Sequence, residues 1–235
     1  MILDRRRSIS LVAAVLAVIL GSGSLPAQAH PVTIAILPFA DRGSFGQEKD
    51  VFRAFRLGIP ATIAGELRAH SELRLADPLR VQQALKAQKL GPSERVDAAT
   101  AARVGKDVGA RYAITGSFAD FYSRFRLDAR IVDVESGQIL KVVSNSDPTL
   151  QDRADLYRIV RGVAHKVLAE ANPTSQVREA EGRIIPTDAL TQFSLGLLAE
   201  SGDDSSGAAR HYTQALSAFP DYPEAREGLR RVRGS

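Results

Sequence analysis

Apolar and polar residues follow one another along the chain with periods that predict a succession of strands and helices. Val32 to Leu37 is short, β-branched and apolar on both faces, as in a strand buried within a sheet. Pro38 is expected to end this strand. After a polar loop, a helix is expected to begin near Pro60, because proline suits a first helical turn. A second short strand is expected around Leu73 to Leu75.

Two helices are expected next. Asp77 can accept the free amide protons of a helix start, and Pro78 supplies a preset first turn. An alanine-rich helix follows from about Ala98 to Val108. Gly109 is expected to end it, because glycine accepts the left-handed conformation that often follows a helix.

The most strand-like region comes after this glycine. Tyr112 to Phe118 is apolar, and Phe125 to Ile131 alternates with charged residues, as in an antiparallel strand with one exposed face. A turn at Ser136 and Gly137 leads to a strand from Ile139 to Val143. A long helix from about Asp152 to Glu170 has one apolar face.

This order of elements predicts an α+β fold, in which helices pack on a mixed five-stranded sheet, over residues 30–173. Residues 174–186 are polar with little periodicity and are expected to be a linker. Residues 187–235 are expected to form a small all-α helical-repeat unit that ends in a capping helix from Glu224 to Val232.

The first 29 residues have the three parts of a secretory signal peptide. Arg5 to Arg7 is basic, Leu11 to Leu20 is an apolar run, and Ala27 and Ala29 are small. The run is about half of the ~20 residues that span a bilayer, so a membrane anchor is the weaker alternative. Cleavage near Ala29 is expected to release the protein into the periplasm, by either general or twin-arginine export.

Composition narrows the possibilities further. The chain has no cysteine, so it is not expected to be a lipoprotein, and its stability must come from a packed core. Removal of residues 1–29 lowers the net charge from +4 to +2. Because the remaining basic residues are scattered, nucleic acid is not an expected partner. No later segment is apolar enough to predict a transmembrane span.

Several stretches carry a resemblance to a known family. Ile34 to Phe39, Ala76 to Val81, Ala101 to Ser117 and Ala129 to Gly137 resemble the curli-assembly (CsgG-like) family of envelope proteins and the related TolB amino-terminal-like domain. The resemblance implies an α+β scaffold and a role in envelope assembly or secretion. Pores of that family are lipid-anchored and insert hairpins into the outer membrane. This chain lacks the cysteine and a long alternating hairpin, so a soluble accessory protein is expected instead.

The stretch from Thr187 to Tyr222 resembles one tetratricopeptide repeat, with small residues where two antiparallel helices would touch. About three repeats are usually needed for stability, so this one is expected to dock on the first domain or on repeats of another chain. The resemblance places six residues on a concave partner-binding surface: Leu190, Phe193, Leu197, Glu200, Asp221 and Tyr222. The alternative is that these residues are core or solvated.

No arrangement of residues predicts a catalytic, metal or cofactor site. His70, His165 and His211 lack the spacing of a metal motif, and no phosphate loop or nucleophile elbow is present. Asp128 and Asp133 are expected to be solvated strand residues on opposite faces. The protein is therefore not expected to be an enzyme or to need a cofactor.

Aromatic residues gather at two places that the fold could bring together. Phe121, Tyr122 and Phe125 lie at a predicted hairpin, and Phe39 and Phe45 flank the first loop. Exposed, they would form a contact patch, and buried, they would be core. The core interpretation is favoured for Phe125 and Phe39.

The sequence thus favours a non-enzymatic periplasmic protein that acts by contact with protein partners of the cell envelope, and it leaves self-association open. The alternative is a small-molecule-binding or sensing module, with the loop from Asp41 to Asp50 as its site. A hydrolase with an unrecognised site is the third hypothesis.

Overall fold

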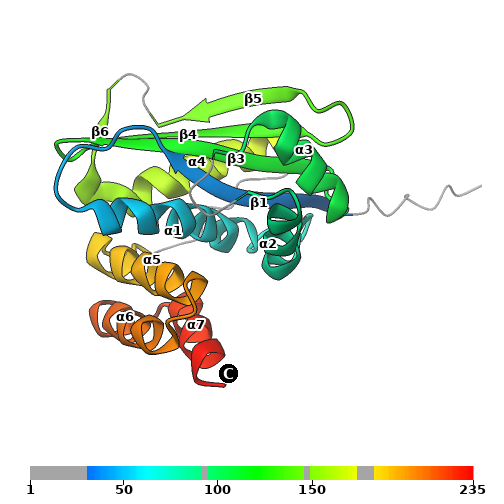
Figure 1. The fold of residues 1–235 in the computed structure, drawn as a ribbon. Coiled ribbons are helices and arrows are strands. Elements are labelled where there is room, and N and C mark those ends of the chain that lie inside the picture. The colour runs from blue at the N-terminus through cyan, green and yellow to red at the C-terminus, as the bar shows by residue number, and fades with distance from the viewer. Residues whose placement is uncertain (1–30, 91–94, 146–148, 174–182, 235) are drawn as a thin grey trace, which may run out of the picture.

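The computed structural model describes residues 31–90, 95–145, 149–173 and 183–234, which fold around a curled mixed sheet (Figure 1). The predicted signal peptide and residues 174–182 of the predicted linker lie outside the described residues. The strands are β1 (Val32–Asp41), β2 (Leu73–Leu75), β3 (Tyr112–Phe121), β4 (Arg124–Asp133), β5 (Ile139–Ser144) and β6 (Gln151–Asp152).

The sheet has the order β2-β1-β3-β4-β5, and the two-residue β6 also pairs with β4. The pairs β1 with β2 and β1 with β3 are parallel, and the pairs that β4 makes with β3, β5 and β6 are antiparallel. The predicted mixed five-stranded sheet is therefore confirmed, with β6 as an addition that was too short to show in the sequence pattern.

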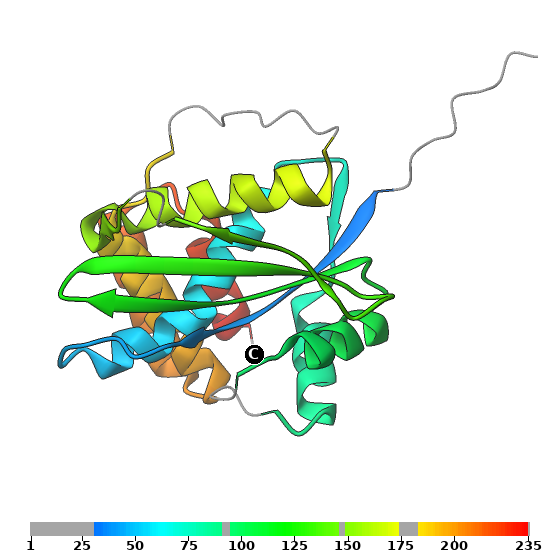
Figure 2. The ribbon, with the colours of Figure 1, turned by 90° about the horizontal axis from the view of Figure 1, so that it is seen from above.

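Helices cover both faces of the sheet. They are α1 (Lys49–Leu67), α2 (Pro78–Ala87), α3 (Ala98–Asp107), α4 (Leu156–Ala171), α5 (Thr187–Ser201), α6 (Ser205–Ala218) and α7 (Pro223–Arg233), with a 3₁₀ turn η1 (Arg153–Asp155) before α4. Helices α1 and α4 pack on one face, and α2 and α3 pack on the other (Figure 2). Across the described residues, no helix combines the length and apolar character that a membrane span requires.

The two boundaries that the sequence analysis placed at prolines differ in the structure. Helix α1 begins at Lys49, so the predicted start near Pro60 is wrong, and Pro60 lies inside the helix. An interior proline costs about 3 kcal/mol, but the helix buries Phe52, Phe55 and Ile63 among others, and each buried side chain of this size contributes about 1.5–3 kcal/mol. Strand β1 likewise continues past Pro38, where its register with β3 shifts between Ile36 and Phe39.

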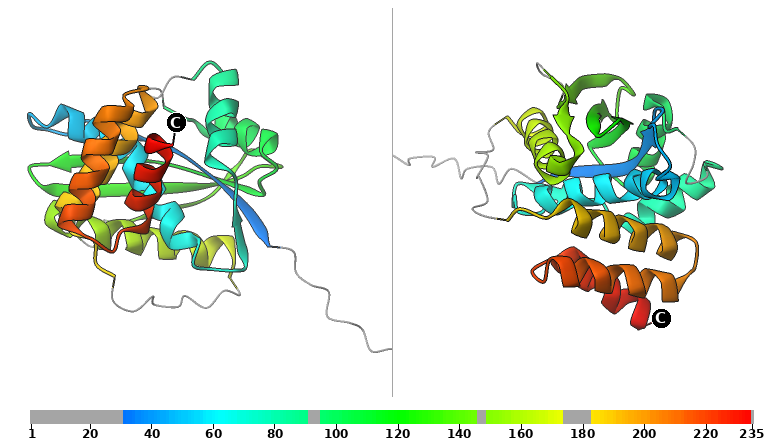
Figure 3. Two further views of the ribbon diagram at one scale, coloured as in Figure 1. Left: turned by 90° about the horizontal axis from the view of Figure 1, so that it is seen from below. Right: turned by 90° about the vertical axis from the view of Figure 1, so that its left-hand side faces the viewer.

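The last three helices form a layer that rests on α1 (Figure 3). The contact between α5 and α1 is close, because a Cβ added at Gly58 would lie 1.8 Å from the Ser194 hydroxyl oxygen. Buried residues of one continuous cluster run from the sheet through α1 to Phe193 and Tyr212. Of the two docking alternatives for α5, α6 and α7, the structure shows packing on α1 of their own chain.

The end of the predicted linker is also held in place. Ile185 is 2% exposed, and Arg183 donates hydrogen bonds of 2.9 and 3.1 Å to the Glu224 carboxylate on α7. Arg183 also lies 3.6 Å from a carboxylate oxygen of Glu66 on α1. These contacts fasten the entry to α5 and join α7 to α1.

Candidate protein-interaction surface

The six residues predicted as a concave binding surface do not form one exposed surface. Leu190, Phe193 and Tyr222 are buried, and the rings of Phe193 and Tyr222 lie 5.0 Å apart inside the packed helices. Leu197 and Glu200 are partly exposed, and Asp221 is exposed. The buried members of the set contact this chain's own core, so their side chains are not exposed to a partner in this structure.

The carboxylate of Glu200 is similarly engaged within its own chain. It accepts a hydrogen bond from the Tyr212 hydroxyl and two more, of 2.7 and 2.9 Å, from Arg231. Burial acts to raise the pKa of Glu200, but the hydrogen bonds from Arg231 and Tyr212 outweigh it and hold the pKa below its ordinary value. Glu200 therefore stabilises the packing of α5, α6 and α7.

A different group of residues, Phe45, Phe121 and Tyr122, forms an exposed aromatic cluster. Their exposed fractions are 55%, 38% and 84%, and the ring of Phe45 lies 5.9 Å from that of Phe121 and 6.0 Å from that of Tyr122. The other two aromatic residues singled out in the sequence, Phe39 and Phe125, are fully buried, so their assignment to the core is confirmed. We call the three exposed side chains the aromatic cluster.

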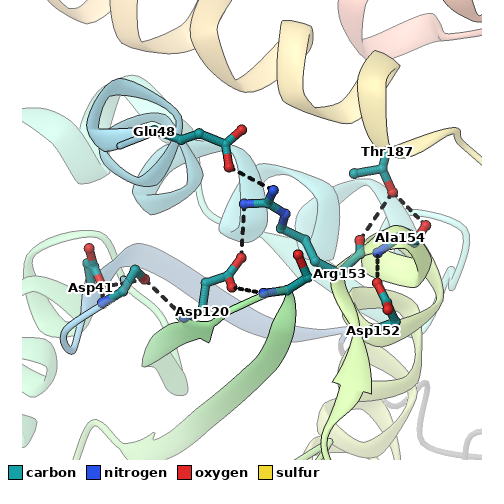
Figure 4. Close-up of polar contacts among 9 residues, drawn as sticks. Asp41, Glu48, Asp120, Asp152, Arg153, Ala154 and Thr187 are labelled. Carbon is teal, nitrogen blue, oxygen red and sulfur yellow. Dashed lines mark hydrogen bonds and ion pairs between the residues drawn. The ribbon is translucent and has the colours of Figure 1, made fainter. Parts of the chain in front are cut away.

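The loop after β1 holds Phe45 in the aromatic cluster. Asp41 accepts hydrogen bonds from the backbone amides of Gly43 and Ser44, at 3.1 and 2.9 Å, and from the Ser44 hydroxyl at 2.7 Å. Ser44 in turn accepts a hydrogen bond from the Asp120 amide, and the Phe45 amide donates to the Asp120 carbonyl. The loop is thereby pinned along the end of β3 (Figure 4).

The β3–β4 hairpin presents the other two aromatic side chains. Tyr122 and Ser123 form its two-residue turn with φ values of 53° and 68°, a conformation that asparagine and glycine adopt far more readily. The carboxylate of Asp120 supports the turn by accepting a 2.7 Å hydrogen bond from the Ser123 amide. A large, exposed aromatic residue at a strained turn position points to a role other than stability.

Arg153 in η1 braces the base of this hairpin (Figure 4). Its guanidinium lies 2.9 Å from a carboxylate oxygen of Asp120 and 2.7 Å from one of Glu48, just before α1. Its backbone amide donates to the Ser123 carbonyl at 2.7 Å. The Thr187 hydroxyl, at the start of α5, donates to the carbonyls of Ala154 and Arg153.

The aromatic cluster therefore stands on a base that joins the sheet, α1, α4 and α5. The side chain of Asp120 is 1% exposed, so the ion pair beneath the hairpin is shielded from water. A surface fixed in this way loses little conformational entropy when a partner binds.

The two aspartates that the sequence analysis singled out on β4 form ion pairs within the chain. Asp133 is 6% exposed, so its assignment as a solvated strand residue is wrong: its carboxylate accepts hydrogen bonds from Ser136 and lies 2.9 Å from the Arg111 guanidinium. Asp128 is partly exposed and pairs with Arg126. Within the described ranges, no three histidine, aspartate or glutamate side chains group together as metal ligands.

Comparison with known protein families and with curated proteins finds no match. Among solved structures, this chain is similar to the LpoB C-terminal domain from Salmonella enterica, at 15% identity over 51% of this chain and 84% of that one, with a TM-score of 0.37. It is similar to lipoprotein GNA1162 from Neisseria meningitidis, at 16% identity over 62% and 100% of the two chains, with a TM-score of 0.38. It is also similar to TolB from Acinetobacter baumannii, at 15% identity over 60% of this chain and 28% of that one, with a TM-score of 0.33.

These likenesses are too slight to carry a function from those proteins to this chain. The three structures include neither a curli-assembly protein nor a tetratricopeptide-repeat protein. The expectations of a CsgG-like family, of a tetratricopeptide-type repeat and of a chain without a lipid anchor therefore stay predictions.

Proposed function

We propose that this protein acts by protein-protein contact in the cell envelope, without catalysing a reaction, and that the aromatic cluster is the surface that its partner binds. The observation that carries the proposal is the exposure of Phe45, Phe121 and Tyr122 side by side on a fixed base. Contiguous exposed aromatic side chains are a frequent mark of protein contact sites.

The chemistry of the cluster indicates what kind of partner it fits. Aromatic rings offer a large apolar area with few rotatable bonds, so they bind apolar side chains at a low entropic cost. Arg124 follows the hairpin turn at the edge of the cluster and is exposed. A matching partner presents an apolar ridge with acidic residues at its rim.

The location in the envelope rests on the signal peptide predicted for residues 1–29, and export would place the aromatic cluster in the periplasm. The curli pathway is not part of the proposal, because no observation on this chain besides the sequence resemblance supports it.

Photo-crosslinking in cells tests the proposal. A photoreactive residue at position 122 is expected to give one discrete adduct with an envelope protein, whose identity mass spectrometry then supplies. The matched control position is Leu79 on α2, which is 63% exposed and lies outside the cluster. The proposal fails if position 122 gives no discrete adduct, or if position 79 gives the same one.

A second exposed apolar surface favours self-association. On the edge strand β5, Ile139, Leu140 and Val142 are 44%, 53% and 51% exposed. Among the described strands, β5 pairs only with β4, so its outer edge is open to another strand. Light scattering is expected to show a concentration-dependent dimer that Val142→Lys abolishes, and a wild-type monomer at all concentrations would contradict this.

A further inference from the structure

Arginine side chains surround a hollow beside the end of β1, a feature that the protein-contact function does not use. The hollow has a volume of about 480 Å³ and is lined by Ala40, Asp41, Arg42, Arg53, Arg56 and Arg95. These residues come from β1 and the residue after it, the first half of α1 and the segment before α3. It is next to the loop that the sequence offered as an alternative ligand site.

The wall formed by α1 holds its arginines in defined positions. Arg56 is 9% exposed, and its Nε donates a 3.2 Å hydrogen bond to the Phe39 carbonyl. Arg53 lies almost one turn earlier on the helix and forms an exposed ion pair with Asp50. Helix α1 thus contributes two guanidinium groups to the hollow: that of Arg56 is buried and anchored, and that of Arg53 is exposed.

The rest of the lining is also tied to the sheet. Arg95 is exposed, and the carbonyl of the next residue, Val96, accepts a hydrogen bond from the buried Thr115 hydroxyl on β3. Arg42 is exposed and follows β1 directly. Within the part of the chain that the structure describes, neither Arg42 nor Arg95 forms an ion pair.

The charge of the hollow is therefore strongly positive. Asp41, the one carboxylate in its lining, already accepts three hydrogen bonds from the loop that follows it. Burial, followed by repulsion from Arg95 and Arg42, lowers the pKa of Arg130 on β4. Burial also lowers the pKa of Arg56, against the opposing charge of Asp41. A bound anion would offset the positive charge of the hollow.

We propose that this hollow is a binding site for a small oxyanion that carries at least two negative charges on carboxylate or phosphate groups, with Arg42, Arg53 and Arg95 as its ligands. The planar guanidinium group matches the oxygens of a carboxylate or phosphate and can donate two parallel hydrogen bonds to them. Arg56 forms the fixed positive floor. The site uses no side chain of the aromatic cluster, although Asp41 in its lining also anchors the loop that holds Phe45, and it adds ligand binding to protein contact.

Isothermal titration calorimetry with pyrophosphate and with citrate tests this site. The measurement is made at an ionic strength of about 0.15 M, where charges more than ~8 Å apart are largely screened. The wild-type protein is expected to bind at least one of the two probes with a saturable isotherm, and the preferred probe identifies the chemical group. Saturable binding of neither probe overturns the proposal.

Two double variants locate the binding. Arg42→Gln with Arg95→Gln is expected to weaken the affinity about tenfold or more, because charge-assisted hydrogen bonds are lost. Arg210→Gln with Arg230→Gln removes the same charge from exposed positions on α6 and α7. This control is expected to keep the wild-type affinity, and an equal loss in both variants also overturns the proposal.

Discussion

Arg153 and Asp120 meet in an ion pair, with 2.9 Å between Nη1 and a carboxylate oxygen, although one precedes α4 and the other lies near the end of β3. The Asp120 side chain is 1% exposed and that of Arg153 is 21% exposed. This pair lies at the base of the hairpin that carries Phe121 and Tyr122, so the position of the aromatic cluster depends on a shielded charge contact.

Arg153→Gln is expected to lower the free energy of unfolding by about 2–4 kcal/mol, because it leaves the Asp120 carboxylate buried without its countercharge. Urea denaturation measures the change. The matched control is Arg158→Gln, whose partner Asp155 is half exposed at 3.6 Å, and which is expected to change the free energy by less than about 0.5 kcal/mol. Equal effects of the two substitutions would contradict a structural role for the buried pair.

Tyr122→Asn is expected to keep or raise the free energy of unfolding, by up to about 1 kcal/mol, because asparagine tolerates the φ of 53° at this turn better than tyrosine does. The same substitution is expected to reduce partner binding. Thermal denaturation gives the first quantity and binding to the crosslinked partner the second. A variant that is less stable than wild type would show that Tyr122 is retained for folding.

Gly58→Ala tests the docking of α5 on α1. The new methyl group would collide with Ser194, so the substitution is expected to destabilise the protein by about 1–3 kcal/mol. Gly162→Ala on α4 is the control, because a Cβ there meets nothing within 4 Å and alanine favours a helix over glycine by about 1 kcal/mol. In chemical denaturation, the free energy of unfolding is therefore expected to fall for Gly58→Ala and to rise for Gly162→Ala. A change in the same direction for both variants would argue against a close α1–α5 contact.

The lowered pKa of Glu200 predicts that the packing of α5, α6 and α7 loses stability in acid. Its pKa is lower in the folded protein than in the unfolded chain, so it contributes stability that is complete above its ordinary pKa of 4.5 and is lost as the pH falls through the lower folded value. Glu200→Gln is expected to flatten this part of the curve of unfolding free energy against pH. If the variant loses stability at low pH as steeply as the wild type does, other carboxylates are responsible for the loss.

The periodicity of apolar residues predicted the five main strands and the order of the helices, because both depend on local burial patterns. It placed the start of α1 wrongly, since the local signal of Pro60 is weaker than the burial of Phe52 and Phe55 in the finished core. The alternation in β4 put Phe125 inside, as observed.

The candidate site was harder to predict. The contacts among Glu48, Asp120 and Arg153 join three segments that are far apart in the sequence, so no residue spacing predicts them. The hairpin at Tyr122 was predicted, but the sequence left open whether its aromatic residues are exposed, and it did not indicate the positive φ values of Tyr122 and Ser123. For the arginine-lined hollow, the one local signal in the sequence is the spacing of three between Arg53 and Arg56, which places both on one side of a helix.

The affinity of the purified partner for wild-type protein and for the double variant Phe45→Ala with Tyr122→Asn is the most direct test of the aromatic cluster. Loss of two aromatic contacts at the centre of an interface is expected to weaken binding about thirtyfold or more, with the unfolding free energy within about 1 kcal/mol of wild type. Leu79→Ala, an exposed apolar residue outside the cluster, is expected to bind as wild type does. Wild-type affinity in the double variant would contradict the assignment of the cluster as the partner-binding surface.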